Sequence, residues 1–142
     1  MQLTPYLMFN GNCEEALNFY VKALNGEIVN LMHFEGSPVE AMATAADKQR
    51  VLHSHFKAKE IFFMASDTGK GGPSLNKNGM VHLSINFDEA AEQERVFTAL
   101  SEGGAVGMPL QDTFWGAKFG MLTDRFGICW MLNFEKSKSE KQ

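Results

Sequence analysis

Cysteine is scarce in this chain, which excludes a fold held together by disulfide bonds. Only two of the 142 residues are cysteine, Cys13 and Cys129, and they stand far apart and outside any CxxC motif. Small secreted domains that depend on disulfides are rich in cysteine, and CxxC pairs mark many zinc and redox sites. Two isolated cysteines therefore predict reduced thiols and a cytoplasmic location.

The sequence also lacks an apolar run approaching the ~20 residues that a membrane-spanning helix needs. Residues 1–5 show no basic segment followed by a long apolar stretch, so we expect no signal peptide. Basic residues are outnumbered, with a formal net charge of −4, and they are scattered until the tail at 135–142. This balance argues against a nucleic-acid surface. We expect a protein with neither a membrane nor a nucleic-acid partner.

The most informative stretch that is present lies near the C-terminus and is rich in aromatic residues. Asp124 suits the first position of a type I turn, and Gly127 supplies a positive φ after it. Such a hairpin is apolar on both faces, so it belongs in a deep core or against a cavity, and a plain core is the more common role. The predicted parts are a short strand at Lys118–Leu122, a turn at Thr123–Gly127 and a last strand at Ile128–Phe134.

The N-terminal half shows strand patterns around one helix pattern. Asn12 suits an N-cap, with Glu15 completing a capping-box pattern, and Asn25-Gly26 suits a left-handed C-terminal cap. Between these signals apolar residues recur at helical spacing. The predicted elements are a strand at Leu3–Phe9, a helix at Cys13–Leu24, and strands at Glu27–Phe34, Arg50–Ala58 and Ile61–Ser66, with a loop at Glu35–Gln49 that contains a helical turn.

The same order of patterns starts again after a polar, Gly-rich stretch, so that Leu3 aligns with Val81. That stretch lacks the strand–GxxxxGK[ST]–helix order of a phosphate loop and is expected to be a linker or lid. Asp88 suits the N-cap of the second helix. The predicted elements are a strand at Val81–Phe87, a helix at Glu89–Glu102, a strand at Ala105–Leu110 and the C-terminal hairpin.

Each half therefore reads β-α-β-β-β, and a single helix covers only one face of such a sheet. The sequence predicts an α+β fold of two βαβββ modules whose uncovered faces are buried or enclosed together. The composition, 44% hydrophobic and 21% charged, is that of an ordinary globular protein. We expect a single domain over 1–142, with module one at about 1–66, a linker at 67–80, module two at about 81–134 and a tail at 135–142.

Two motifs resemble those of a known family. The opening PYLMFNGNCEEALNFY (Pro5–Tyr20) looks like the start of PhnB-like proteins, a branch of the glyoxalase/bleomycin resistance/dioxygenase (vicinal oxygen chelate) superfamily. The ending at Thr113–Asn133 is similar to theirs too, and the likeness covers nearly the whole chain. The resemblance implies paired modules that curve a mixed sheet around a cavity, commonly in a homodimer. It also implies either divalent-metal chemistry on small molecules or simple sequestering of small drugs.

The resemblance allows the metal site of that superfamily to be checked residue by residue. Its enzymes take one ligand from the first and last strand of each module, and these positions fall on Pro5, Met64, His82 and Met131. Only the histidine is a good ligand, because proline offers no side-chain donor and a thioether binds hard ions poorly. The expectation is therefore no cofactor and no metal at the usual site.

His53 and His55 complicate this expectation, because they alternate on one face of the predicted third strand. If a two-residue loop follows that strand, the same face also carries Met64. His82 and Ser84 occupy the ligand face of the second module's first strand. Two interpretations stay open: ordinary structural or solvent-facing histidines, or the polar lining of a binding cavity. A displaced metal site built from the three histidines is the weakest interpretation, since the core strands carry no carboxylate.

The functional prediction combines these residues with two aromatic ones, Trp115 and Phe119, which can stack on a planar ligand or simply pack. We predict a protein that binds a small molecule, and we leave open whether it is an enzyme, because no catalytic residue can be assigned. The alternative is a divalent-metal-dependent lyase, isomerase or dioxygenase with a non-standard site. The predicted ligand-binding residues are His53, His55, Met64, His82, Ser84, Trp115, Phe119 and Met131.

Overall fold

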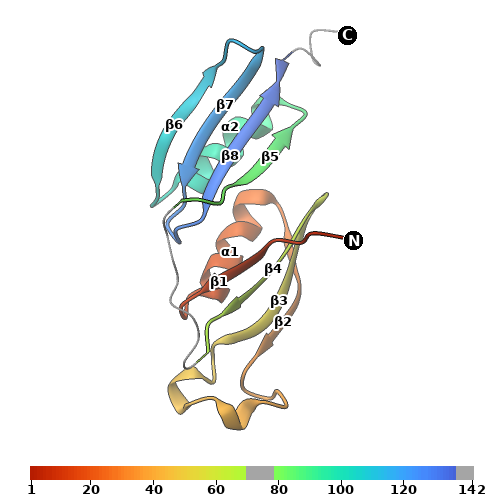
Figure 1. Cartoon of the computed structure of the whole chain (residues 1–142), viewed down its shortest axis with the longest axis vertical. Coiled ribbons are helices and arrows are strands. Elements are labelled where there is room, and N and C mark those ends of the chain that lie inside the picture. Colours follow the sequence, from red (N-terminus) through yellow and green to blue (C-terminus); the bar gives the residue numbers. More distant parts are fainter. Residues whose placement is uncertain (70–78, 137–142) are drawn as a thin grey trace. The chain divides into compact units, whose positions relative to one another are not determined.

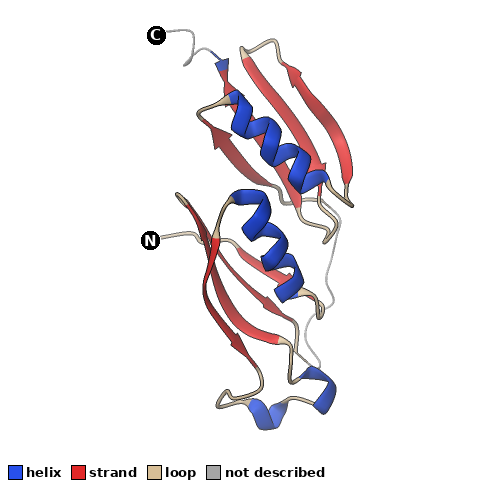
Figure 2. Cartoon of the chain, turned by 180° about the vertical axis from the view of Figure 1, so that it is seen from behind, coloured by secondary structure: helices blue, strands red, loops and turns tan. Residues whose placement is uncertain are grey.

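The computed structural model describes residues 1–69 and 79–136. The chain divides into two compact units, Met1–Asn76 and Lys77–Gln142. Each unit has one four-stranded sheet with one α-helix lying across one of its faces (Figure 1 and Figure 2). Most of the predicted linker at 67–80 lies outside the described residues. No helix in the described ranges is long and apolar enough to cross a membrane.

The sheet of the first unit has the strand order β1-β4-β3-β2. β1 runs parallel to β4, and the other neighbours are antiparallel. Two short 3₁₀ turns, Glu40–Met42 and Ala45–Asp47, lie in the segment where one helical turn was predicted. The elements are β1 Tyr6–Phe9, α1 Cys13–Leu24, β2 Glu27–His33, β3 Val51–Ala58 and β4 Ile61–Asp67.

The second unit repeats this topology, with the strand order β5-β8-β7-β6 and β5 parallel to β8. The elements are β5 Leu83–Phe87, α2 Ala90–Ser101, β6 Ala105–Asp112, β7 Ala117–Thr123 and β8 Cys129–Glu135. The predicted α+β fold of two βαβββ modules is therefore confirmed. It consists of two mixed four-stranded sheets, neither of which closes on itself.

One face of each sheet packs against its helix and forms the core of the unit. In the first unit the ring of Tyr20 on α1 meets Phe56 and Phe63 edge-on at 6.4 and 5.8 Å, and those two rings stack at 4.6 Å. In the second unit Leu100 on α2 and Trp130 on β8 are almost fully buried. These faces follow the predicted periodicities of helix and strand.

α1 begins at the predicted residue, but the side chain that caps its first turn differs from the prediction. The side chain of Asn12 makes no capping hydrogen bond. The carboxylate of Asp67, at the end of β4, takes that place: Oδ1 accepts from the backbone N–H of Gly11 at 2.8 Å and of Cys13 at 3.0 Å. Its Oδ2 accepts from the N–H of Val51 at 2.9 Å. Asp67 thus ties the helix start to two strands, and a carboxylate is a stronger acceptor than an amide.

Of the other predicted caps and turns, two are confirmed and one is wrong. Asn25 has the left-handed conformation (φ 53°) predicted for the end of α1. The predicted N-cap Asp88 is wrong, because the cap of α2 is Glu89, which makes no side-chain capping bond. The turn from Asp124 to Gly127 is confirmed: Gly127 has φ 93° and its N–H donates to the Asp124 carbonyl at 3.0 Å.

Candidate functional site

Within residues 1–69, no other element covers the face of the first sheet opposite α1, which carries imidazole, aromatic and thioether groups. We call it the open face of the first sheet. Alternation along each strand places these side chains there, and several of them are about 40% exposed. Its members include Tyr6 and Met8 on β1, Met32 on β2, His53 and His55 on β3, and Phe62 and Met64 on β4. The register also places Asn30 beside His55 and Lys57 beside Phe62 on this face.

A hydrogen-bonded row crosses this face. The hydroxyl of Tyr6 lies 3.0 Å from His53 Nδ1, and His53 Nε2 lies 2.9 Å from His55 Nε2. The Tyr6 and His53 rings also stack at 5.7 Å, and His55 meets Phe62 edge-on at 5.7 Å. Two facing Nε2 atoms bond only when one carries a proton and the other does not. The two imidazoles therefore form one coupled unit, held in place by the tyrosine.

Strand pairing explains how these side chains meet. Tyr6 and His55 are both direct partners of Met64, one in the parallel pair and one in the antiparallel pair. β3 and β4 are joined through Lys59-Glu60 alone, so the predicted two-residue loop is confirmed, and with it the place of Met64 beside His55. Tyr6 was not among the predicted site residues, although its alternation with Met8 on a short strand could have placed it on this face.

The second sheet has an open face of its own, with amides and apolar groups. Ser84 is paired with Met131, and Asn86 with Asn133, whose Nδ2 donates to Asn86 Oδ1 at 3.3 Å. Phe119 on β7 is the partner of Asn133 on its other side. Three predicted residues, Ser84, Phe119 and Met131, thus share this face, while His53, His55 and Met64 share the open face of the first sheet.

The internal repeat shows that the imidazole pair is not required by the fold. His55 opposes Met64 in the first sheet as Met121 opposes Met131 in the second. The same register makes His53 the counterpart of Phe119. The second sheet therefore holds a phenyl ring and a thioether where the first has two imidazoles. The fold accepts apolar groups at these positions, so packing alone does not explain why the first sheet has histidines there.

His82 immediately precedes the first strand of the second unit. β5 begins at Leu83, one residue after it. Its Nε2 donates to the Gly79 carbonyl at 2.8 Å, and its Nδ1 is buried without a hydrogen-bond partner among the described residues. The structure therefore gives His82 a local contact within the second unit.

Trp115 lies in the turn between β6 and β7 and is 59% exposed. Its ring meets Phe114 edge-on at 4.9 Å and Phe119 at 6.3 Å. Trp130 is the opposite case: it is 1% exposed, and its indole N–H donates to Asp124 Oδ2 at 2.8 Å. Trp115 is therefore a surface aromatic residue beside the open face of the second sheet.

The residues at the usual metal positions of the superfamily do not fit a hard divalent ion. Met64 and Met131 offer thioethers, and Pro5 contributes only its carbonyl, which accepts from the Met64 N–H at 3.0 Å. Within residues 1–69 and 79–136, no three His, Cys, Asp or Glu side chains come together in a way that could hold an ion. These positions therefore lack the donors that a hard divalent ion needs.

Cys13 has an environment that suppresses thiolate chemistry. It is fully buried, and burial together with the negative charge of Asp67 raises the pKa of its thiol to about 12. A thiol must ionise to act as a nucleophile. Cys13 is therefore a core residue, as expected from its place in the inner stripe of α1.

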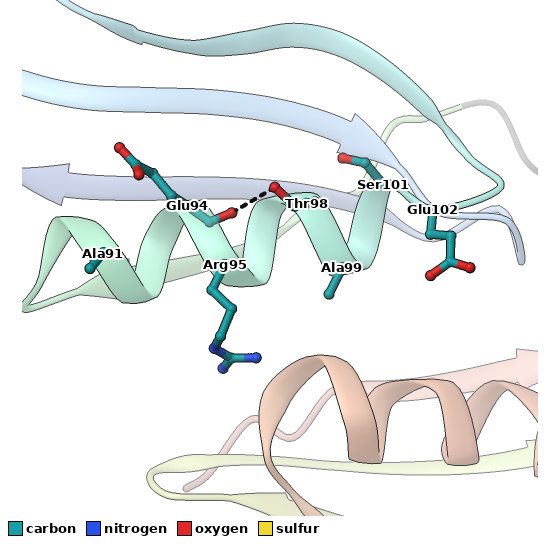
Figure 3. A pocket seen from close by; sticks show the side chains of 7 residues that line it. All are labelled: Ala91, Glu94, Arg95, Thr98, Ala99, Ser101 and Glu102. Atoms are coloured by element: carbon teal, nitrogen blue, oxygen red, sulfur yellow. Dashed lines mark hydrogen bonds between the residues drawn. The ribbon is translucent and has the colours of Figure 1, made fainter.

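One further hollow lies on the outer side of α2, away from its sheet (Figure 3). All of its lining comes from this one helix, and within it the Thr98 hydroxyl donates to the Glu94 carbonyl at 3.0 Å. A surface of this kind offers a ligand contacts on one side only, unlike the concave sites that bind small molecules. The lining residues are Ala91, Glu94, Arg95, Thr98, Ala99, Ser101 and Glu102.

Comparison with solved structures defines the class of fold. The structure is similar to a glyoxylase/bleomycin resistance protein/dioxygenase domain from Frankia sp. EAN1pec, with a TM-score of 0.67 over 95% of this chain and 97% of that one. The identity is 12%, so this likeness shows the fold alone. The paired βαβββ modules thus have the fold of glyoxylase/bleomycin resistance protein/dioxygenase domains.

A family model and relatives of higher sequence identity show the family to which the chain belongs. A family model described as 3-demethylubiquinone-9 3-methyltransferase matches residues 1–133, and the chain belongs to that family, the PhnB-like branch of the superfamily. The crystal structure of protein PA1353 from Pseudomonas aeruginosa is 44% identical, with a TM-score of 0.83 over 95% of this chain and 98% of that one. A PhnB protein from Bacillus cereus is 29% identical, with a TM-score of 0.78 over 94% and 99%. Protein YjdN of Escherichia coli is 30% identical over 97% of this chain and 98% of its own.

Proposed function

We propose that this protein binds a small, flat, partly apolar molecule at its open sheet faces, and that the coupled imidazoles recognise a polar edge of that molecule. The observation that carries the proposal is the row Tyr6–His53–His55 on a face that also carries thioethers and aromatic rings. The register adds an amide, Asn30, and an ammonium group, Lys57, to this face. Small-molecule sites combine apolar and aromatic lining with a few well-placed polar groups. This face has that composition.

The imidazole pair is suited to recognition because it offers both a donor and an acceptor. In the neutral pair one Nε2–H is used internally, and the outward Nδ1 of His55 remains for a ligand group. Flat rings gain contact area from the thioethers of Met64 and from aromatic neighbours such as Phe62. On the second sheet, Trp115 and Phe119 offer a further aromatic surface.

The relatives support a small-molecule ligand. The family description names a demethylubiquinone as the molecule on which that family acts, and a quinone ring is a flat molecule of the proposed class. A distant structural neighbour, FosX from Listeria monocytogenes, is a fosfomycin resistance protein and shares the fold at 11% identity.

Two further proposals concern the state of the protein in the cell. We place it in the cytoplasm, because Cys13 and Cys129 are free thiols and suit a reducing compartment. We also propose a homodimer, the assembly that the resemblance to this superfamily implies.

The test uses substitutions that the internal repeat has already shown to suit this fold. A ligand-observed NMR screen of flat phenols and quinones would supply a hit, whose affinity is then titrated against the double variant His53→Phe/His55→Met. These residues stand at the equivalent positions of the second sheet, so the fold should be kept. We expect at least ~10-fold weaker binding, from the loss of one or two hydrogen bonds.

The matched control lies on the outer side of α2, where Thr98→Ala should leave the affinity unchanged. Unchanged affinity in the double variant, with loss of binding in Thr98→Ala, would move the site to the hollow on α2 and overturn the proposal.

A further inference from the structure

The imidazole pair also has the geometry of a metal-binding pair. His53 Nε2 and His55 Nε2 lie 2.9 Å apart, so once both rings carry their proton on Nδ1, both Nε2 lone pairs are directed at the space between the rings. Two imidazoles that bind the same ion at about 2.0–2.1 Å have nitrogens that are about 3.3 Å apart in tetrahedral geometry. A change of a few tenths of an ångström in the ring positions would therefore admit an ion between them.

The neighbours of the pair are soft ligands. Met32 on β2 is the direct register partner of His53, and Met64 on β4 is that of His55. Directly opposed residues on antiparallel strands have Cβ atoms about 4.5–5.5 Å apart, within reach of a thioether. The remaining register partner, Asn30 opposite His55, carries an amide and no charge.

The chemical type of these ligands indicates which metal ion they would bind. Thioether and imidazole ligands without carboxylates suit copper(I), whereas zinc, magnesium and calcium sites call for thiolate, carboxylate or additional imidazole ligands. We propose that His53, His55, Met32 and Met64 bind one copper(I) ion on the open face of the first sheet. This inference goes beyond the proposed small-molecule function and does not depend on it.

Tyr6 gives this site an orienting group. For His53 to bind through Nε2, its proton must sit on Nδ1, and the Tyr6 oxygen, 3.0 Å away, then accepts that proton's hydrogen bond. An outer partner of this kind fixes the tautomer and ring orientation of a metal-bound histidine. His55 likewise carries its proton on Nδ1, so the neutral pair binds the ion by a change of tautomer with no net proton release.

The experiment is an anaerobic titration of copper(I) against a chromophoric chelator, bicinchoninate, using the full chain. The proposal predicts one equivalent of copper(I) withdrawn from the chelator by the wild-type protein. His53→Phe and His55→Leu should each weaken binding at least ~100-fold, and Tyr6→Phe ~10-fold, as expected for outer partners. The isosteric pair Met32→Leu/Met64→Leu should also weaken binding while keeping the exposed apolar face.

Three controls make the result decisive. His33→Gln removes a histidine of the same unit whose Nε2 contacts Glu14 on α1 at 2.6 Å, and it should bind copper(I) like the wild type. Cys13→Ala/Cys129→Ala removes both thiols, which also bind copper(I), and the site should persist. Circular dichroism and α1 amide shifts verify folding, and if a histidine variant unfolds the methionine pair decides the question.

The proposal is overturned if the chelator keeps all copper(I) in the presence of wild-type protein. It is equally overturned if binding disappears with the two cysteines, or if zinc(II) alone binds more tightly than copper(I). A small-molecule screen that finds no ligand leaves this titration unaffected, so the two proposals fail separately.

Discussion

Replacing each tryptophan with alanine separates the core of the second unit from its surface. Trp130 is 1% exposed, and its indole donates to Asp124 Oδ2 at 2.8 Å. Removal of a buried large ring costs about 3–5 kcal/mol of unfolding free energy. Trp115 is 59% exposed and touches Phe114 and Phe119 only edge-on. Aromatic pairs of this kind contribute about 0.5–1.5 kcal/mol.

Trp130→Ala should therefore destabilise the protein more than Trp115→Ala, by roughly 2 kcal/mol when the middle of the two ranges is compared and two aromatic pairs are lost with Trp115. Urea unfolding followed by far-UV circular dichroism measures both, because tryptophan fluorescence changes with the substitutions. Total unfolding free energies are about 5–15 kcal/mol, so the loss in Trp130→Ala is a large part of the total and leaves little folded protein without denaturant in the least stable case. Trp130→Phe keeps an aromatic ring but loses the second ring of the indole with its N–H, and should cost about 1–3 kcal/mol. Equal losses in the two alanine variants would place Trp115 in the core and refute this reasoning.

Three more predictions concern buried groups and assembly. Asp67→Asn should lower the free energy of unfolding, measured with urea, by about 1.5–3 kcal/mol, because an amide NH₂ would face a backbone N–H donor. The control Asp88→Asn changes an exposed residue and should alter this free energy little. The Cys13 thiol has an ordinary pKa of 9.0, raised to about 12 when folded, so the unfolded chain loses this proton first as the pH rises. Stability should then fall by up to about 1.4 kcal/mol per pH unit between those values, a slope absent from Cys13→Ala; identical slopes would contradict the burial argument. Light scattering should give about twice the chain mass of 15.8 kDa, and a monomer at all concentrations would rule out the homodimer.

The sequence was sufficient for features with local causes. α1 was predicted with both ends correct, because its apolar stripe and the left-handed Asn25 are written in adjacent residues. The repeat of βαβββ order was likewise visible, since strand and helix periodicities differ. β6 runs past its predicted end at Leu110 to Asp112 despite Pro109, which an edge strand tolerates.

What could not be predicted depends on contacts between distant segments. Asp67 replaces Asn12 as the cap of α1 only because the parallel pairing of β1 with β4 brings its carboxylate to the helix start. The bond between His53 and His55 depends on ring rotation, which alternation along a strand does not specify. Tyr6 joins them through the same parallel pairing.

NMR mapping of amides and ¹³C-labelled methionine methyls tests whether ligands bind at the open sheet faces. During titration with a hit from the flat-molecule screen, the methyls of Met64 and Met131 should shift, together with the amide of His55. Amides of Ala91 and Thr98, on the outer side of α2, should stay in place. Shifts confined to the α2 amides, with both methyls unmoved, would contradict the account.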